Sequence, residues 1–270
     1  MKKIRFLASL LVCLFLTNVK AQDKTTVFEG KNLVTFGNSI TSAPNSWAYQ
    51  LAKELKFGNF YNGAVGGAIW SKRERTTASG LKIKTQNFDD VDFAGVSNTG
   101  TQNPDDVEFQ KRINNCAIVH IQKYLSNKDV PSPDFIILSY GTNDLSNEAV
   151  MGNATSALKE RKLDNLDVNT LAGALKWCLS TLQTKFPKAK IYVSLPLQAA
   201  NENKNLGNLK KIEIITKICD GLSVPYFNCY AECEITQENN KQYLRDGLHP
   251  NEEGKSVHAK YIIKKLKEAN

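Results

Sequence analysis

The segment Leu33-Val34-Thr35-Phe36-Gly37-Asn38-Ser39-Ile40-Thr41 is an apolar, β-branched run that stops at a glycine. Such a run predicts a buried strand, from about Asn32 to Phe36, that ends in a tight turn. The residues from Ser46 to Leu55 have the pattern of a helix. Ser39 is therefore expected at the carboxyl end of a strand, just before a helix, where ligands bind in open α/β sheets. A hydroxyl group in this place can act as a nucleophile if a base reaches it.

Strands and helices alternate along the rest of the chain. Further strands are predicted at Phe60–Asn62, Asp134–Tyr140, Ile191–Leu195 and Val224–Phe227, and further helices at Val107–Leu125, Val168–Lys185, Asn208–Asp220 and Asn251–Lys267. A linker that contains Gly152 separates two of these elements, and Gly221 is a predicted C-cap. The alternation predicts an α/β fold in which a five-stranded parallel sheet has helices on both faces, as a three-layer sandwich. Right-handed crossovers then bring the carboxyl ends of all strands to one edge.

One histidine of the three in the chain is placed to serve as the base. His249 lies in the loop Asp246-Gly247-Leu248-His249-Pro250, just before the last predicted helix and therefore at the same edge as Ser39. Asp246 lies three residues before His249, a spacing that lets the carboxylate accept a hydrogen bond from Nδ1 and fix the tautomer of the ring. His120 lies on the apolar face of a predicted helix and is interpreted as a packed core residue. His258 lies in mid-helix and is interpreted as a surface or packing residue.

Two more loops at this edge could bind the oxyanion of a tetrahedral intermediate. Asn62-Gly63-Ala64-Val65-Gly66-Gly67-Ala68 is rich in glycine, which lets the backbone approach a ligand closely. Gly141-Thr142-Asn143-Asp144 follows the strongest predicted strand. The candidate donors are the backbone N–H of Ser39, a backbone N–H of the glycine loop and the amide of Asn143. One such donor is typically worth about 10²–10³ in turnover.

These four motifs, in this order, resemble those of the SGNH hydrolases, also called the GDSL esterase/lipase family. The resemblance extends from about Leu33 to the C-terminus, except for an apparent insertion at about residues 70–106. It implies a flavodoxin-like fold and ester hydrolysis through an acyl-enzyme by Ser39, His249 and Asp246. It also implies an oxyanion hole of Ser39, Gly67 and Asn143, with Gly66 as the alternative to Gly67. We expect neither a metal ion nor another cofactor.

The resemblance has one departure beside the nucleophile. Asn38 stands where the family usually has an aspartate. This aspartate does not belong to the catalytic triad, and an amide can still brace the turn through hydrogen bonds. We therefore expect an active enzyme, with a non-catalytic carbohydrate-binding relative as the alternative.

Residues 1–21 have the pattern of a signal peptide. A basic start at Lys2, Lys3 and Arg5 precedes the apolar run Phe6–Leu16, and Val19-Lys20-Ala21 ends in a small residue. The run is too short for a membrane span. The esterase domain is therefore predicted at residues 22–270, in a secreted or periplasmic protein without stable membrane insertion, although an uncleaved anchor is the alternative.

Charge and motifs together limit the partners of this domain. The formal net charge of the chain is +8, and removal of residues 1–21 takes away four basic and no acidic residues, which leaves +4. So small an excess does not favour nucleic-acid binding. The expected partner is a small-molecule or polysaccharide ester. Export favours a carbohydrate (acetyl) esterase, with a GDSL lipase or lysophospholipase as the alternative. Trp47 and Trp70 flank two motif loops and could stack on sugar rings or pack at the edge of the core.

The cysteines give no firm framework. Five of the six remain after removal of residues 1–21, and an odd number cannot all pair. We interpret Cys116, Cys178 and Cys219 as small buried apolar residues. Cys229 and Cys233 are close enough in sequence for a local disulfide, which is kept as an alternative, and no second pair or histidine accompanies them as in a metal site.

Overall fold

The computed structural model describes residues 27–72 and 115–270. The predicted signal peptide and all but the first residues of the predicted insertion lie outside the described residues. Five strands form one sheet in the order β2-β1-β3-β4-β5, and every neighbouring pair is parallel. The strands are β1 (Asn32–Gly37), β2 (Asn59–Asn62), β3 (Phe135–Ser139), β4 (Lys190–Ser194) and β5 (Tyr226–Phe227). The predicted five-stranded parallel sheet is confirmed.

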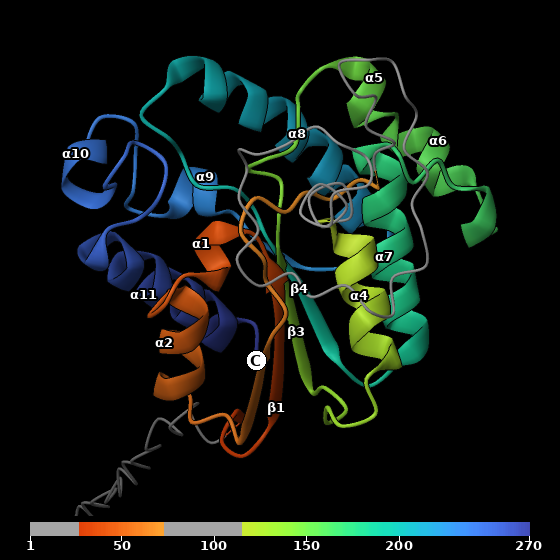
Figure 1. Ribbon diagram of the computed structural model, residues 1–270, viewed down its shortest axis with the longest axis horizontal. Coiled ribbons are helices and arrows are strands. Elements are labelled where there is room, and N and C mark those ends of the chain that lie inside the picture. Colours follow the sequence, from red (N-terminus) through yellow and green to blue (C-terminus); the bar gives the residue numbers. More distant parts are fainter. Residues whose placement is uncertain (1–26, 73–114) are drawn as a thin grey trace, which may run out of the picture.

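Helices cover both faces of this sheet, as Figure 1 shows. One face carries α2 (Trp47–Glu54), α9 (Cys229–Glu232) and α11 (Glu252–Glu268). The other face carries α4 (Ala117–Ser126), α6 (Ala154–Lys159), α7 (Leu171–Lys185) and α8 (Glu202–Gly221). The remaining helical segments are short: α1 (Ser39–Ser42), α5 (Glu148–Met151), the 3₁₀ turn η2 (Leu163–Asn165) and α10 (Asn240–Tyr243).

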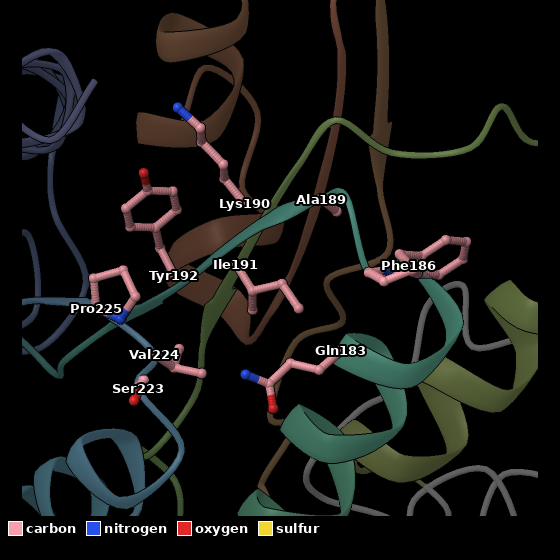
Figure 2. A pocket seen from close by; sticks show the side chains of 10 residues that line it. Gln183, Phe186, Ala189, Lys190, Ile191, Tyr192, Ser223, Val224 and Pro225 are labelled. Atoms are coloured by element: carbon pink, nitrogen blue, oxygen red, sulfur yellow. The ribbon is translucent and has the colours of Figure 1, made fainter.

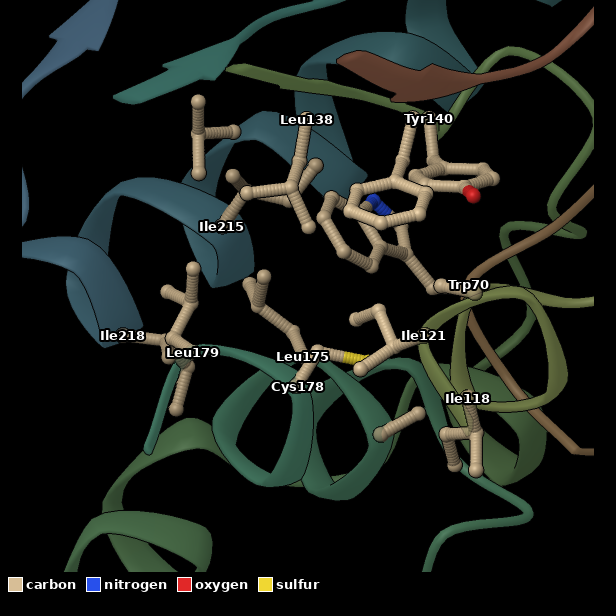
Figure 3. Packing of buried hydrophobic residues seen from close by; sticks show 14 of the residues in the cluster. Trp70, Ile118, Ile121, Leu138, Tyr140, Leu175, Cys178, Leu179, Ile215 and Ile218 are labelled. Atoms are coloured by element: carbon tan, nitrogen blue, oxygen red, sulfur yellow. The ribbon is translucent and has the colours of Figure 1, made fainter. Parts of the chain in front are cut away.

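Successive strand residues point into two separate apolar layers. In β3, Ile136 and Leu138 belong to the layer beneath α4 and α7, whereas Phe135 and Ile137 belong to the layer beneath α2 and α11. All four side chains are almost fully buried, as expected for parallel strands covered on both faces. Figure 3 shows Leu138 and the following Tyr140 on the sheet side of the first layer, facing side chains of α7. Polar groups at the strand ends are thereby left for the edges of the sheet.

Several element boundaries differ from those predicted from the sequence. Residues 107–114 of the helix predicted at Val107–Leu125 lie outside the described residues, and the described part of this helix, α4, begins at Ala117. Helix α7 begins at Leu171 because Thr170 caps it by accepting a hydrogen bond from Gly173 N (3.1 Å). The segment interpreted as a linker around Gly152 contains the short helices α5 and α6.

Helix α8 differs most from its prediction. It begins six residues before Asn208, at Glu202, after the cap Asn201, and Gly221 is its last residue rather than its C-cap. The physical reason lies in its first two turns, where the buried positions are held by Asn205, Gly207 and Asn208, none of which is a large apolar residue. Because these buried positions are not apolar, the sequence there has no helical pattern of apolar residues, although this face of α8 packs against the rest of the molecule.

All five cysteines among the described residues are free and buried. Cys116, Cys178 and Cys219 belong to the apolar layer beneath α7, as interpreted from the sequence. The alternative of a local disulfide between Cys229 and Cys233 is not realised in this structure. Both thiols belong instead to the second apolar layer, where the sulfur of Cys229 lies 3.2 Å from the Ser194 hydroxyl.

Candidate active site

Ser39 is the first residue of the short helix α1, directly beyond the end of β1. The buried Asn38 caps this helix, because its Oδ1 accepts a hydrogen bond from Ile40 N (3.0 Å). The amide therefore braces the turn, as we expected for a residue in place of aspartate. Gly37 is required here, since a Cβ at this position would lie 2.8 Å from the Ser139 carbonyl of β3. This close approach brings the loops that follow β1 and β3 side by side.

The structure brings Ser39 together with His249 and Asp246. The Oγ atom of Ser39 lies 2.9 Å from Nε2 of His249, across 210 residues of sequence. On the other side of the ring, Nδ1 lies 2.8 Å from Oδ2 of Asp246. With the proton of the neutral ring on Nδ1, this nitrogen donates to the carboxylate and Nε2 accepts from the serine hydroxyl. In this arrangement, the imidazole can take the Ser39 proton while the carboxylate orients it.

The loop that carries Asp246 and His249 is held mainly by its own short hydrogen bonds. Oδ1 of Asp246 accepts from His249 N (2.7 Å) and from Leu248 N (3.1 Å). Gly247 has a φ of 77°, a left-handed conformation that favours glycine. One bond reaches outward, from Ala200 N to the Gly247 carbonyl (2.8 Å). The aspartate and the histidine are thus held together by a tight local turn.

Asp246 is an anion in this arrangement. Its partial burial raises the pKa of the carboxyl group, but hydrogen bonds from the His249 backbone, the His249 ring and the Leu248 backbone outweigh this effect and lower the pKa to about 2. Arg245 adds a cation, with Nε 3.5 Å from Oδ2 of Asp246. The side chain of Asp246 is 46% exposed, so solvent screens much of this interaction.

The glycine loop is attached to the end of β1. Gly63 N donates to the Thr35 carbonyl (2.8 Å), and Val65 N donates to the Gly37 carbonyl (3.0 Å). Beyond these bonds, the chain makes a β-turn in which Ala68 N donates to the Val65 carbonyl (3.2 Å). Gly67 occupies the third position of this turn with a φ of 75°. The candidate oxyanion donors of the glycine loop therefore lie in a turn that is anchored beside Ser39.

Two neighbouring side chains join the loop after β3 to the glycine loop. Nδ2 of Asn143 donates to the Ala68 carbonyl (3.1 Å), which leaves its second N–H for another acceptor. The carboxylate of Asp144, only 3% exposed, accepts from Trp70 N at 3.1 and 3.2 Å. Gly37 of β1 and Ser139 of β3 are partners in the sheet register, so both loops begin at the same level. Ser39, Gly67 and Asn143 thus come from three connected loops at one edge.

A buried lysine supports the loop after β3 from below. Lys211 of α8 is 1% exposed, and its ammonium group donates to the carbonyls of Gly141 (2.6 Å) and Asp144 (3.0 Å). Lys204, in the first turn of the same helix, donates to the Thr142 carbonyl. Burial lowers the pKa of its ammonium group. Neither lysine was identified from the sequence. The signal that could have found Lys211 is a lysine at a position where the helical packing face requires burial.

The other two histidines lie in the core. His120 is 3% exposed, and its Nδ1 lies 2.8 Å from the hydroxyl of Tyr140. His258 is 2% exposed and packs against the Trp47 ring, with 5.9 Å between the ring centroids. Burial lowers the pKa of each to about 3, with Lys123 as a second cause for His120, so both rings are neutral at physiological pH. The interpretation of His120 as a packed core residue is confirmed, and of the two alternatives for His258 the structure has packing.

Trp47 and Trp70 are both fully buried. Of the two alternatives raised by the sequence, stacking on sugar rings is therefore wrong, and packing in the core is correct. Trp70 packs against Tyr140 with the two rings tilted by 52° and 4.8 Å between their centroids, in the layer that Figure 3 shows. Within residues 27–72 and 115–270, no group of three side chains that could hold a metal ion comes together. None of the described helices is both long and apolar enough to cross a membrane.

A separate cavity of about 370 Å³ lies at the opposite edge of the sheet. Its lining includes Lys190 and Ile191, which begin β4, and Pro225, which precedes β5. In Figure 2, Ile191 points toward Gln183, while the side chains of Lys190 and Tyr192 extend from the other side of the strand. The described lining contains no histidine, cysteine or acidic residue, so it lacks a serine–histidine–carboxylate set like that at Ser39. The site around Ser39 is the better candidate for catalysis.

Comparisons with known proteins identify relatives of this fold and the family of this chain. Three solved structures share the fold: a protein from Lactobacillus plantarum (18% identity, TM-score 0.59, 89% of this chain and 98% of that chain covered), the lipase/acylhydrolase from Enterococcus faecalis (11%, 0.51, 88% and 96%) and a catalytic mutant of an acetylxylan esterase from Geobacillus stearothermophilus (11%, 0.50, 88% and 94%). No curated protein matches this sequence. The model of the GDSL-like lipase/acylhydrolase family matches residues 35–257. The chain therefore belongs to the GDSL-like lipase/acylhydrolase family.

Proposed function

We propose that this protein is an exported serine esterase that cleaves an acyl ester through an acyl-enzyme. Ser39 is the nucleophile, His249 the general base and acid, and Asp246 the group that orients and stabilises the imidazolium. The observation that carries this proposal is the continuous series of contacts from Ser39 Oγ to His249 Nε2 (2.9 Å) and from His249 Nδ1 to Asp246 Oδ2 (2.8 Å). The spacing of these groups is that of a hydrogen-bonded nucleophile and base whose base is held by a third group.

The first half of the reaction forms an acyl-enzyme. Ser39 Oγ attacks the carbonyl carbon of the ester while its proton passes to Nε2 of His249. The oxyanion that forms accepts hydrogen bonds from the N–H groups of Ser39 and Gly67 and from the amide of Asn143. The intermediate then collapses, the bond to the alcohol breaks, and the leaving oxygen takes the proton from His249. The product of this half is an acyl group on Ser39.

The second half uses the same groups for water. His249 takes a proton from a water molecule, whose oxygen attacks the acyl carbon. When this second intermediate collapses, Ser39 Oγ leaves and regains the proton from His249, and the carboxylic acid is released. Because Asp246 is ionised, it stabilises the imidazolium in both halves.

Hydrolysis of 4-nitrophenyl acetate by wild type and by Ser39→Ala tests this function. Wild type should release 4-nitrophenol, and Ser39→Ala should show no release above background, because it lacks the nucleophile. Ser42→Ala is the matched control, since Ser42 ends the same short helix, and it should retain wild-type activity. Equal rates in wild type and Ser39→Ala would contradict the proposal.

For the natural substrate we propose an acetylated carbohydrate. The support is the signal-peptide pattern of residues 1–21, which directs the enzyme to extracellular polymers, and the acetylxylan esterase among the proteins of this fold. Acetylated oligosaccharides should be cleaved with a higher kcat/KM than lysophospholipids or long-chain esters. The opposite preference would identify a lipase or lysophospholipase instead. The intact mass of exported protein should correspond to a start near Gln22, and retention of Met1 would contradict export with cleavage.

A further inference from the structure

The turn Val65-Gly66-Gly67-Ala68 has a middle peptide that can face either of two directions. Ala68 N donates to the Val65 carbonyl (3.2 Å), and Gly67 has a positive φ of 75°. Gly66 is not among the residues with positive φ, so this is a type II turn. In a type I turn, which places the third residue at negative φ, the middle peptide is rotated by about half a turn. Two glycines in the middle permit either form.

This rotation decides where the Gly67 N–H points. The carbonyl of Gly66 and the N–H of Gly67 belong to one planar trans peptide, so they point in opposite directions. A group that binds the Gly66 carbonyl from one side therefore directs the Gly67 N–H to the other side. Any such group selects the turn type and, with it, the orientation of this donor.

Asn115 is such a group. Its Nδ2 donates to the Gly66 carbonyl at 2.6 Å, and the side chain is buried, at 4% exposure for the residue. The backbone around it is fixed to the same loop: Ile69 N donates to the Asn115 carbonyl (3.3 Å), and Ala117 N donates to the Ile69 carbonyl (2.9 Å). Asn115 thus reaches the turn from a short parallel bridge that runs along the end of the glycine loop.

We propose that Asn115 is a positioning residue that holds the Gly66–Gly67 peptide in the type II orientation and so presents the Gly67 N–H to the oxyanion. This inference rests on the proposed function and extends it to a residue that does not touch the substrate. The Asn115 amide sets the direction of the Gly66–Gly67 peptide, because two glycines alone permit either orientation.

The hydrogen bonding of Asn115 is consistent with this role rather than with one in stability alone. Its Oδ1 atom is buried and has no hydrogen-bond partner in the structure. A buried acceptor without a partner destabilises a fold, so an apolar side chain of similar size would serve packing better. What an apolar side chain cannot supply is the N–H that Gly66 accepts.

The kinetic test measures the loss of kcat in Asn115 variants and its recovery by a second substitution. With 4-nitrophenyl acetate, Asn115→Ala should lower kcat by about tenfold to a hundredfold at nearly unchanged KM, because the donor acts on the transition state. Asn115→Asp, which cannot donate when ionised, should lower kcat at least as much. Asn127→Ala, at the exposed end of α4, is the matched control and should retain the wild-type kcat.

The rescue variant restores the turn by another means. Pro at the second position with Gly at the third favours type II, and a Cβ at Gly66 meets no atom within 4 Å. Gly66→Pro added to Asn115→Ala should therefore recover most of the lost kcat. A purely structural role of Asn115 predicts no recovery, and that result would overturn the proposal.

A crystal structure of Asn115→Ala supplies a readout that does not depend on turnover. We expect the Gly66–Gly67 peptide to be reversed or to occupy two orientations, with Gly67 at negative φ in the reversed one. A single type II turn like that of the wild type would overturn the proposal. Absence of Ser39-dependent hydrolysis in the wild type would instead contradict the proposed function, and the peptide orientation would still decide the role of Asn115.

Discussion

The two halves of the candidate site are built in opposite ways. The half that moves protons, Asp246 and His249, comes from one four-residue turn, and these side chains are 46% and 26% exposed. The half that binds the oxyanion depends on buried polar side chains from distant segments. Asn115, Asp144 and Lys211 are 4%, 3% and 1% exposed, and each holds part of a loop that carries a candidate donor.

This difference follows from what each half must do. A base has to reach the solvent and the leaving group, so a tight surface turn with its own hydrogen bonds is sufficient. Oxyanion donors lower the barrier only if they are fixed before the charge develops, because then no reorganisation is needed during the reaction. Buried polar groups that hydrogen-bond to the loop backbone provide such rigidity. Mutations in the exposed half should therefore lower turnover with little loss of stability, whereas mutations of the buried supports should lower both.

The largest effect is expected in the exposed half. His249→Gln removes the base, and kcat should fall by about 10⁴-fold, as for loss of a triad member. The free energy of unfolding should change little, because the ring of His249 is partly exposed and held by a local turn. Turnover of 4-nitrophenyl acetate and chemical denaturation measure the two quantities. A variant that keeps a tenth or more of the wild-type kcat would show that another group is the base.

A smaller effect is expected for the donor side chain of the buried half. Asn143→Ala should lower kcat by about 10²–10³, with little change in KM, because its free N–H acts mainly on the transition state. Steady-state kinetics over a range of ester concentrations separate the two constants. If KM rose while kcat stayed constant, Asn143 would bind the substrate rather than the oxyanion.

The support beneath that donor should affect stability as well. Lys211→Met removes the donor for two buried carbonyls, Gly141 and Asp144, and should lower the free energy of unfolding by about 1–3 kcal/mol. Because these carbonyls flank Asn143, kcat should fall too. Lys210→Met is the matched control, since this neighbour is exposed, and its effect should stay within about 0.5 kcal/mol. Equal stability of the two variants would show that Lys211 is not a support.

The smallest effect concerns the ionisation of Asp246. Because its pKa is lowered to about 2, any stability gained from its ionised form is present above the unfolded-state pKa of about 3.9 and is lost only as the pH falls through about 2. Asp246 therefore stays ionised from about pH 9 to about pH 4. Over this range, the logarithm of kcat/KM should fall on acidification with a slope of no more than one, because Asp246 takes up no proton there. A slope of two protons would show that Asp246 also titrates there.

The same contrast explains what could be predicted from the sequence. Strand order along the chain, the parallel sheet and the turn Asp246–His249 follow from local patterns, and Ser39 and Asn143 follow from motifs at the ends of strands. The supports do not. Asn115, Asp144 and Lys211 act through contacts across 49 to 74 residues, and no spacing rule indicates them. The first turns of α8 were not predicted because polar residues lie on their packing face. The start of α7 was predicted too early because the cap formed by Thr170 has no apolar pattern.

Labelling of the nucleophile tests the central claim most directly. The protein is treated with diisopropyl fluorophosphate, which phosphorylates a serine that an adjacent base activates, and the modified peptide is identified by mass spectrometry. We predict a single adduct on Ser39 in wild type, and much slower labelling in His249→Gln because the base is missing. An adduct on a different residue, or a Ser39 that labels equally fast without His249, would contradict the account.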